Sequence, residues 1–237
     1  MANALIVHAV LDLGARDQYV VVESTTGAID QQRDVTGAVV TITTPDDRRL
    51  LAEETRDSTH YPRWNCSDIE CGLAVTTVYH VSLDRYGIDL VPGGTYRLSI
   101  TTPDGRNVSG TTKIPNGLLD TGSTTLMIDS TRDTVRMSVP RVADASAYEV
   151  SASWWYRPTF FNDTAVAVPA PHPLIIFDGG PPPPNLLVVS AVDQNYYDYF
   201  RRASDPWTGS GLISHLDGAI GVFGSIVPVL RRTVVVR

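Results

Sequence analysis

Short runs of alternating apolar and polar residues, separated by turn residues, dominate the chain. The clearest is residues 95–101, where Tyr96, Leu98 and Ile100 alternate with threonine, arginine and serine. This alternation is typical of an antiparallel strand with one face in the core. Residues 103–106, Pro-Asp-Gly-Arg, then predict a hairpin turn, because proline fixes φ and glycine accepts a positive φ.

The first half of the chain repeats this pattern at even spacing. The runs that predict strands are residues 5–10, 18–25, 35–44, 49–53, 73–83, 87–91, 95–101 and 107–114. Short strands with regular turns indicate an immunoglobulin-like β-sandwich. The Pro-Asn-Gly sequence at 115–117 is the best candidate for a domain boundary, so we expect a sandwich at 1–115 and a second β-rich unit at 116–237.

The second unit has fewer turns and longer connections. Strands are predicted at residues 125–129, 134–139, 148–156, 186–192 and 229–236, with a proline-rich loop at 157–184. Tyr196, Tyr199 and Phe200 lie on one face of a predicted helix at 195–202. A small-residue corner before the strand that begins at Tyr148 resembles the fibronectin type III pattern. The predicted fold is therefore all-β, with two tandem immunoglobulin-like or fibronectin III-like sandwiches and one short helix.

Composition narrows the class of protein. The 237 residues are 43% hydrophobic and 19% charged, as in a folded globular protein. The net charge of −7 argues against nucleic acid as a partner, because proteins that bind a duplex carry basic surfaces. No run of about 18 apolar residues occurs, so no transmembrane segment is expected.

The spacing of Cys66 and Cys71 indicates the cellular compartment of the protein. Four residues separate them, whereas a redox pair is normally separated by two, and a zinc site would need two more ligands. A disulfide is the simplest interpretation, and it predicts a periplasmic or cell-surface location. The N-terminus has no basic region before its first apolar run, so no signal peptide is evident. Either the protein is cytoplasmic or the numbering begins after processing, and the cysteines favour the second.

The sequence offers no catalytic motif. It contains no Gly-x-Ser-x-Gly elbow, P-loop, zinc-protease or dinucleotide fingerprint, so we expect neither an enzyme nor a bound cofactor. The glycines of residues 218–224 do not open a helix after a strand and therefore predict close backbone approach or bulges. Asp84, Asp89 and Asp104 lie near turns where calcium could bind, but solvated turn carboxylates explain them more simply. No metal is expected.

Aromatic and proline residues in long connections are the candidate partner contacts. Trp64 and Tyr61 lie in a polar loop at 55–72, and loops of that length in compact domains are usually functional. Pro181 and Pro182 begin a stiff polyproline stretch, which is either a surface spacer or a docking ligand. Trp207 follows the predicted helix. Exposed aromatic side chains are enriched at protein interfaces.

Five short motifs together resemble a family of bacterial envelope lipoproteins of unknown function. They are Leu-Ile-Val at 5–7, Gly-Ala-Val-Val-Thr-Ile at 37–42, Gly-Gly-Thr-Tyr-Arg-Leu-Ser-Ile at 93–100, Tyr-Tyr-Asp-Tyr at 196–199 and Asp-Gly-Ala-Ile-Gly-Val-Phe-Gly at 217–224. Genes of that family often lie beside those of TonB-dependent outer-membrane transporters. Its lipid-bearing cysteine is absent here, which fits numbering that starts downstream of it. The resemblance implies a lipid-anchored or peripheral protein and supplies no catalytic residues.

The expected function is that of a non-enzymatic extracytoplasmic scaffold that docks on a membrane protein complex. A TonB-dependent transporter is the first candidate partner. An extrinsic subunit of a respiratory or photosynthetic assembly is an alternative, and a carbohydrate- or peptide-binding module is another. Tandem sandwiches serve all three roles, so the sequence leaves them open.

Overall fold

The computed structural model describes residues 4–25, 32–57, 76–118, 125–128, 134–153, 155–170, 185–201 and 213–236. These ranges are built almost wholly of β-strands, and the only helices in them are α1 (Leu83–Tyr86) and α2 (Gln194–Phe200). The predicted all-β class is confirmed, and α2 is the short helix expected in the second half. Within the described part of the chain, neither helix has the length and apolar character needed to cross a membrane.

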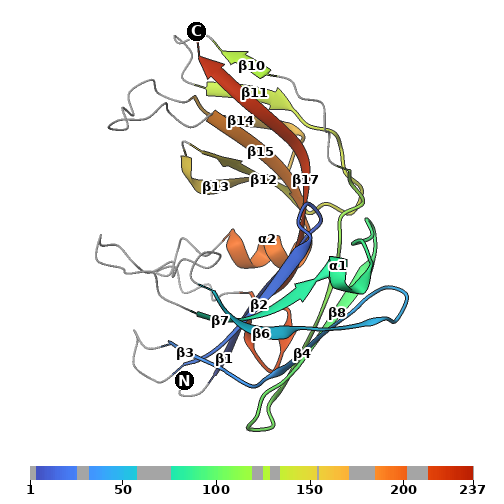
Figure 1. Ribbon diagram of the computed structural model, residues 1–237. Helices are drawn as coiled ribbons and strands as arrows, with labels where there is room; N and C mark the ends of the chain where they lie inside the picture. Colours follow the sequence, from blue (N-terminus) through green and yellow to red (C-terminus); the bar gives the residue numbers. More distant parts are fainter. Residues whose placement is uncertain are drawn as a thin grey trace.

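A ten-stranded sheet runs the length of the molecule (Figure 1). Its main path is β13-β12-β15-β17-β1-β2-β7-β6, with β10 paired to β17 and β3 paired to β2. The strands are β1 (Leu5–Asp12), β2 (Asp17–Thr25), β3 (Gln32–Asp34), β6 (Glu53–Asp57), β7 (Thr76–Ser82), β10 (Thr125–Ile128), β12 (Ala147–Ala152), β13 (Trp155–Phe161), β15 (Asn185–Val192) and β17 (Ile220–Val236).

Two smaller sheets complete the described structure. The five-stranded sheet has the order β16-β9-β8-β4-β5, and the two-stranded sheet pairs β11 with β14. Their bounds are β4 (Val39–Thr43), β5 (Arg49–Leu51), β8 (Thr95–Thr101), β9 (Asn107–Lys113), β11 (Thr134–Ser138), β14 (Ala165–Pro169) and β16 (Leu216–Asp217).

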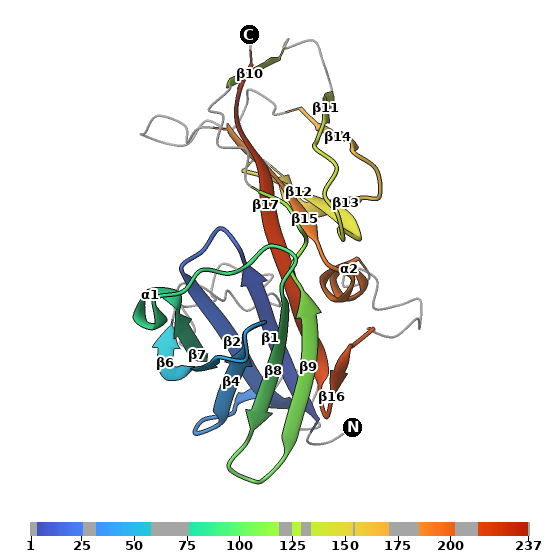
Figure 2. The same cartoon turned by 90° about the vertical axis from the view of Figure 1, so that its right-hand side faces the viewer.

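The first sandwich packs the five-stranded sheet against β1, β2 and β7 (Figure 2). Val7, Val22 and Tyr79 come from the large sheet and are fully buried. They share one core with Ile42 and Ile100 of the five-stranded sheet. The alternation seen in the sequence therefore places one face of each strand in the core. Burying an aliphatic side chain of this size contributes about 1.5–3 kcal/mol.

The second sandwich is smaller and packs β11 and β14 over β12 and β15. Val135 and Val166 belong to the same buried core as Val150 and Leu187. At its corner the Tyr148 hydroxyl accepts a hydrogen bond from the Val142 N–H at 2.8 Å and donates one to the Pro140 carbonyl at 3.1 Å. A tyrosine that bonds back to the preceding corner is a recurring feature of immunoglobulin and fibronectin III sandwiches.

Strand β17 belongs to both sandwiches. Residues 220–226 pair in parallel with β1, residues 226–234 pair antiparallel with β15, and residues 233–236 pair with β10. The division of the chain at residue 115 stays a prediction. Strands from both sides of residue 115 hydrogen-bond within the ten-stranded sheet. Sequence alternation predicted only residues 229–236 as a strand, because the glycines before them interrupt the pattern.

The glycines of residues 218–224 lie where two backbone segments are in close contact. A Cβ on Gly221, whose φ is +140°, would lie 1.9 Å from the Val7 carbonyl oxygen, and one on Gly218 would lie 2.1 Å from the carbonyl oxygen of Asn107. A Cβ on Gly224 would lie 2.9 Å from the backbone nitrogen of Tyr196. The predicted close approach is confirmed. Because neighbouring residues of a strand face opposite ways, Gly224 receives α2 on the face opposite the sandwich core.

Two predicted strands are wrong in detail. Residues 87–91 form no strand, because α1 ends at Gly87 in the left-handed conformation and the chain continues as a loop. Residues 148–156 are not one strand but parts of β12 and β13, which form a hairpin with Ala152 opposite Trp155. The alternation of residue types continues through that turn, so periodicity does not reveal the reversal. Residues 157–184, predicted as a loop, also contain the end of β13 and all of β14.

The Gly224→Ala variant tests the contact between β17 and α2. The added methyl group has no room beside Tyr196, so we expect the free energy of unfolding to fall by about 1–3 kcal/mol. Chemical denaturation of both proteins measures the difference. Ser99→Ala on the exposed face of β8 is the matched control, and equal stability of the two variants would contradict the close packing.

Candidate functional site

The residues chosen from the sequence as partner contacts lie outside the described ranges. They are Tyr61, Trp64, Pro181, Pro182 and Trp207, together with the predicted disulfide partners Cys66 and Cys71. These assignments stay predictions. The described residues instead bring together a buried polar cluster beneath α2, where the two sandwiches meet.

The centre of this cluster is the carboxylate of Asp193, which is 5% exposed. The chain leaves β15 at Val192, and Asp193 is the N-cap of α2. Its Oδ1 atom accepts hydrogen bonds from the backbone N–H groups of Tyr196 and Ser225, both at 3.0 Å. Its Oδ2 atom accepts a bond from the Thr112 hydroxyl at 2.6 Å. An aspartate before a helix is a strong capping residue, and here the same side chain also bonds two strands.

The strands that Asp193 joins belong to different sheets. Thr112 lies on β9 of the five-stranded sheet, whereas Ser225 lies on β17 of the large sheet. The Ser225 hydroxyl donates to the Lys113 carbonyl at 3.1 Å, which adds a second link between the same strands. Burial raises the pKa of Asp193, and the hydrogen bonds from Thr112, Ser225 and Tyr196 only partly oppose that rise.

Asn195 fastens the first turn of α2 to both sheets. Its side-chain amide donates to the Thr111 carbonyl at 2.6 Å and to the Phe223 carbonyl at 2.9 Å. Thr111 lies on β9 and Phe223 on β17, so Asn195 spans the same junction as Asp193. The carbonyl groups of Thr111 and Phe223 therefore receive hydrogen bonds from Asn195, although their strands belong to different sheets.

A second buried carboxyl group, Glu149 of β12, lies on the other side of α2. Its Oε2 atom accepts a hydrogen bond from the Tyr196 hydroxyl at 2.5 Å. The Tyr196 ring packs on Phe200 at 4.4 Å and on Phe160 at 6.3 Å between ring centroids. Burial raises the pKa of Glu149, and the bond from Tyr196 opposes that rise only in part. Tyr196 therefore contacts both buried carboxyl groups, through its N–H and its hydroxyl.

Beneath the last turn of α2, His8 of β1 and Tyr199 form an uncharged pair. Their Nε2 and hydroxyl oxygen atoms are 3.2 Å apart, and their rings meet edge to face. Burial lowers the pKa of His8. Burial, together with the negative charge of Glu23, raises the pKa of Tyr199 to about 12. Both groups are neutral at pH 7, so they join α2 to β1 without placing a charge in the core.

Asp198, a buried residue of α2, contacts Arg201 and His215. Its carboxylate lies 2.8 Å from the Arg201 guanidinium and 3.0 Å from Nε2 of His215. Burial by itself would raise the pKa of Asp198, but hydrogen bonds from Gln194 and His215 and the charge of Arg201 outweigh it and lower the pKa. The helix is thus fastened at its start, its end and both sides.

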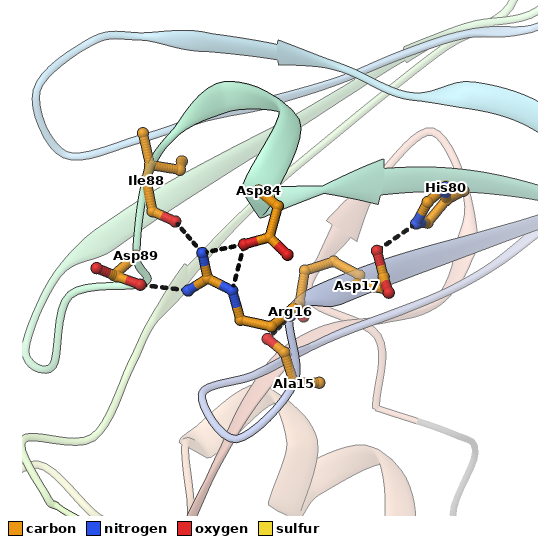
Figure 3. A network of polar contacts seen from close by, with 8 residues as sticks. Ala15, Arg16, Asp17, His80, Asp84, Ile88 and Asp89 are labelled. Carbon is orange, nitrogen blue, oxygen red and sulfur yellow. Dashed lines mark hydrogen bonds and ion pairs between the residues drawn. The ribbon is translucent and has the colours of Figure 1, made fainter.

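A separate network at the first sandwich surrounds Arg16 (Figure 3). The guanidinium donates to Asp84 with its Nε at 2.8 Å, to the Ile88 carbonyl at 3.3 Å and to Asp89. It therefore ties the loop between β1 and β2 to α1 and the segment after it. His80 and Asp17 form a neighbouring pair at 2.7 Å. This network is exposed, and surface ion pairs of this kind contribute little to stability because solvent screens them.

The turn aspartates considered for calcium have protein partners. Asp84 and Asp89 bind Arg16, and Asp104 binds Arg106 and the Thr102 hydroxyl, contacts that lower the pKa of Asp104 to about 2. Within the ranges that the structure describes, no three His, Cys, Asp or Glu side chains are grouped to hold a metal ion.

Reasoning from sequence did not find the cluster beneath α2. Asp193 could have been found, because an aspartate directly before a helical pattern is an N-cap signal. Thr112, Ser225 and Glu149 carry no such signal, since they meet only when distant strands pair. In chemical terms the cluster fixes α2, because the groups that could react already donate to or accept from the protein.

Comparison with known proteins adds the family. The family model described as Domain of unknown function (DUF4249) matches residues 1–226. The chain belongs to the DUF4249 family. The matched range contains Thr112, Asp193 and Ser225, so the whole tie beneath α2 lies within the part that defines the DUF4249 match.

Other comparisons say little about this DUF4249 protein. None of the curated proteins matches it significantly in sequence. A crystal structure of chicken CNTN1 FN1-FN3 domains matches with 11% identity, covering 98% of this chain and 66% of that chain. The TM-score of 0.22 is too low to indicate a common fold.

The Asp193→Ala variant tests the tie beneath α2. It leaves the buried N–H groups of Tyr196 and Ser225 without an acceptor, so we expect the free energy of unfolding to fall by about 2–4 kcal/mol. Asp193→Asn should cost less, because the amide oxygen still accepts from the backbone. Denaturant titration provides the measurement, with Asp217→Ala on exposed β16 as control. A loss no larger than that of the control would disprove the tie.

The pH dependence of stability tests Glu149. Because its pKa is raised in the fold, wild-type stability falls as pH rises from about 4.3, the unfolded value, through the raised folded-state pKa. Glu149→Gln removes this titration, and its side-chain oxygen still accepts from Tyr196. We expect the variant to have the higher Tm at about pH 7 and to lose that advantage below about pH 4.

Thermal melts across that pH range make the comparison. Asp217→Asn on β16 is the control, because Asp217 is exposed and has no ion pair among the described residues. It should give a difference that varies little with pH. A Glu149→Gln variant that is less stable than wild type at neutral pH would refute the buried-carboxyl argument.

Proposed function

We propose that this DUF4249 protein is a non-enzymatic extracytoplasmic scaffold subunit that docks on a membrane protein complex. The observation that carries the proposal is β17, which pairs with β1 in one sandwich and with β15 in the other. A strand shared in this way holds the surfaces of both sandwiches in one fixed arrangement. Fixed surfaces bind a large partner with little loss of conformational entropy.

The polar interior supports the same proposal. Asp193, Glu149 and His8 are hydrogen-bonded to protein donors and acceptors within the described ranges. Such groups make α2 rigid, whereas catalytic acids and bases need access to a substrate. Buried polar groups that bond to the protein itself are consistent with a scaffold.

The surface at the far end of β17 is the docking site that we favour. Met127 and Val235 are register partners of the β10–β17 pair, and they are 42% and 38% exposed. Figure 1 places this pair at the C-terminal tip of the molecule, away from the N-terminus. Adjacent exposed apolar side chains are a feature of interaction sites, whereas isolated ones are common on any surface.

The choice of partner rests on the motif resemblance described above. That resemblance favours a TonB-dependent outer-membrane transporter over a respiratory or photosynthetic assembly. An extracytoplasmic location is part of the same proposal and is supported by the spacing of Cys66 and Cys71.

Affinity purification from detergent-solubilised envelopes tests the proposal. We expect the tagged chain to recover a transporter complex, identified by mass spectrometry. The Met127→Glu/Val235→Glu double variant should reduce recovery at least tenfold, because each carboxylate would be desolvated at the interface. Val39→Glu/Leu51→Glu is the matched control, since both residues are exposed on the five-stranded sheet.

The outcomes separate the candidate roles. Recovery of a respiratory or photosynthetic complex would replace the partner and retain the scaffold role. Selective binding to glycans with no recovered complex would indicate a carbohydrate-binding module instead. Recovery that falls equally in both double variants would move the docking site away from the tip of β17.

A further inference from the structure

The two-stranded sheet of the second sandwich has an open edge along β14. Among the described residues, β14 pairs with β11 alone. The Val139 N–H donates to the Thr164 carbonyl at 2.9 Å, and this bond fixes the direction of the ladder. Because that direction alternates along an antiparallel strand, the backbone groups of Ala165 and Ala167 point away from β11. Within the described ranges these outward N–H and C=O groups have no hydrogen bond.

This edge lacks the features that prevent strands from pairing. The sequence of β14 is Ala-Val-Ala-Val-Pro, with no charged residue, and the small side chains of Ala165 and Ala167 are exposed. The strands that end the large sheet differ, since four of the five residues of β6 are charged and β13 contains Pro158. Charges and proline are the means by which natural edge strands avoid pairing. The edge of β14 is therefore open to another strand.

We infer that this strand is the β14 of a second copy of the chain, so that the protein forms a two-fold symmetric dimer. In an antiparallel pair of β14 strands, Ala165 lies opposite the partner's Ala167 and exchanges both N–H···O=C bonds with it. The two-fold axis repeats this pair, so every outward backbone group of both alanines gains a bond. The edge is thus complementary to itself, as a two-fold interface requires. This dimer is independent of the proposed docking function.

Other two-fold registers would satisfy fewer groups. Pro169 ends β14 and has no N–H, so a register that places it opposite Ala165 loses a donor. A shift in the other direction would use Asp163, which lies in the bend before β14. The side chains agree with the inferred register. Arg136 is the cross-strand partner of Ala167, and the two β14 strands keep it from the partner's Arg136.

Sedimentation velocity of the full chain tests the inference. Because a short interface is weak, the chain is measured from about 5 to 500 μM, and we expect the sedimentation coefficient to rise from monomer to dimer. Ala165→Asp/Ala167→Asp places carboxylates opposite carboxylates, so this variant should stay monomeric. Ser99→Asp/Thr101→Asp on the exposed face of β8 adds the same charge and should dimerise like wild type. A wild-type chain that is monomeric at the highest concentration would overturn the inference.

Charge exchange locates the contact. Ala165→Lys/Ala167→Lys should also be monomeric alone, whereas an equimolar mixture with the aspartate variant should form a heterodimer, because each carboxylate then faces an ammonium group. Native mass spectrometry separates the heterodimer from the homodimers by mass, and thermal melts verify that each variant is folded. Homodimers that persist in the aspartate variant, a mixture that stays monomeric, or equal loss in the β8 control would each rule out pairing through β14.

Discussion

The buried carboxylate of Asp193 is the contact on which the architecture depends. It accepts hydrogen bonds from α2, from β17 and from β9, so one side chain joins a helix and two sheets. Placing a carboxyl group at 5% exposure is unfavourable unless its oxygens are hydrogen-bonded, and here three donors reduce that cost. The group stabilises this junction only as long as all three elements remain assembled.

The junction matters because β17 changes partners there. Its parallel pairing with β1 ends at Ile226, and its antiparallel pairing with β15 begins at the same residue. Where a strand changes partners, some backbone groups lack a partner in the sheet and must bond to side chains. At this junction Asn195 and Ser225 donate hydrogen bonds to two carbonyl groups of β9. Two sandwiches that could move independently are thus held as one body, and α2 occupies the face where Gly224 leaves room.

A rigid, elongated β protein of the DUF4249 family has its polar groups in two different states. Beneath α2 the buried acids, histidine and tyrosines are satisfied by one another and by the backbone, and they serve the fold. At the corner of the second sandwich, Arg141 and Asp163 are exposed to solvent. The docking proposal rests instead on the exposed apolar side chains of Met127 and Val235 at the tip of β17.

The sequence by itself determined the all-β class, most strands of the first sandwich, helix α2 and the close approach at the glycines of residues 218–224. These features depend on local periodicity and backbone freedom, which a short window of sequence contains. It did not determine the hairpin at Ala152, the length of β17 or the cluster around Asp193. Only the tertiary structure decided those, because Thr112 and Ser225 are 113 residues apart and meet solely through the pairing of distant strands.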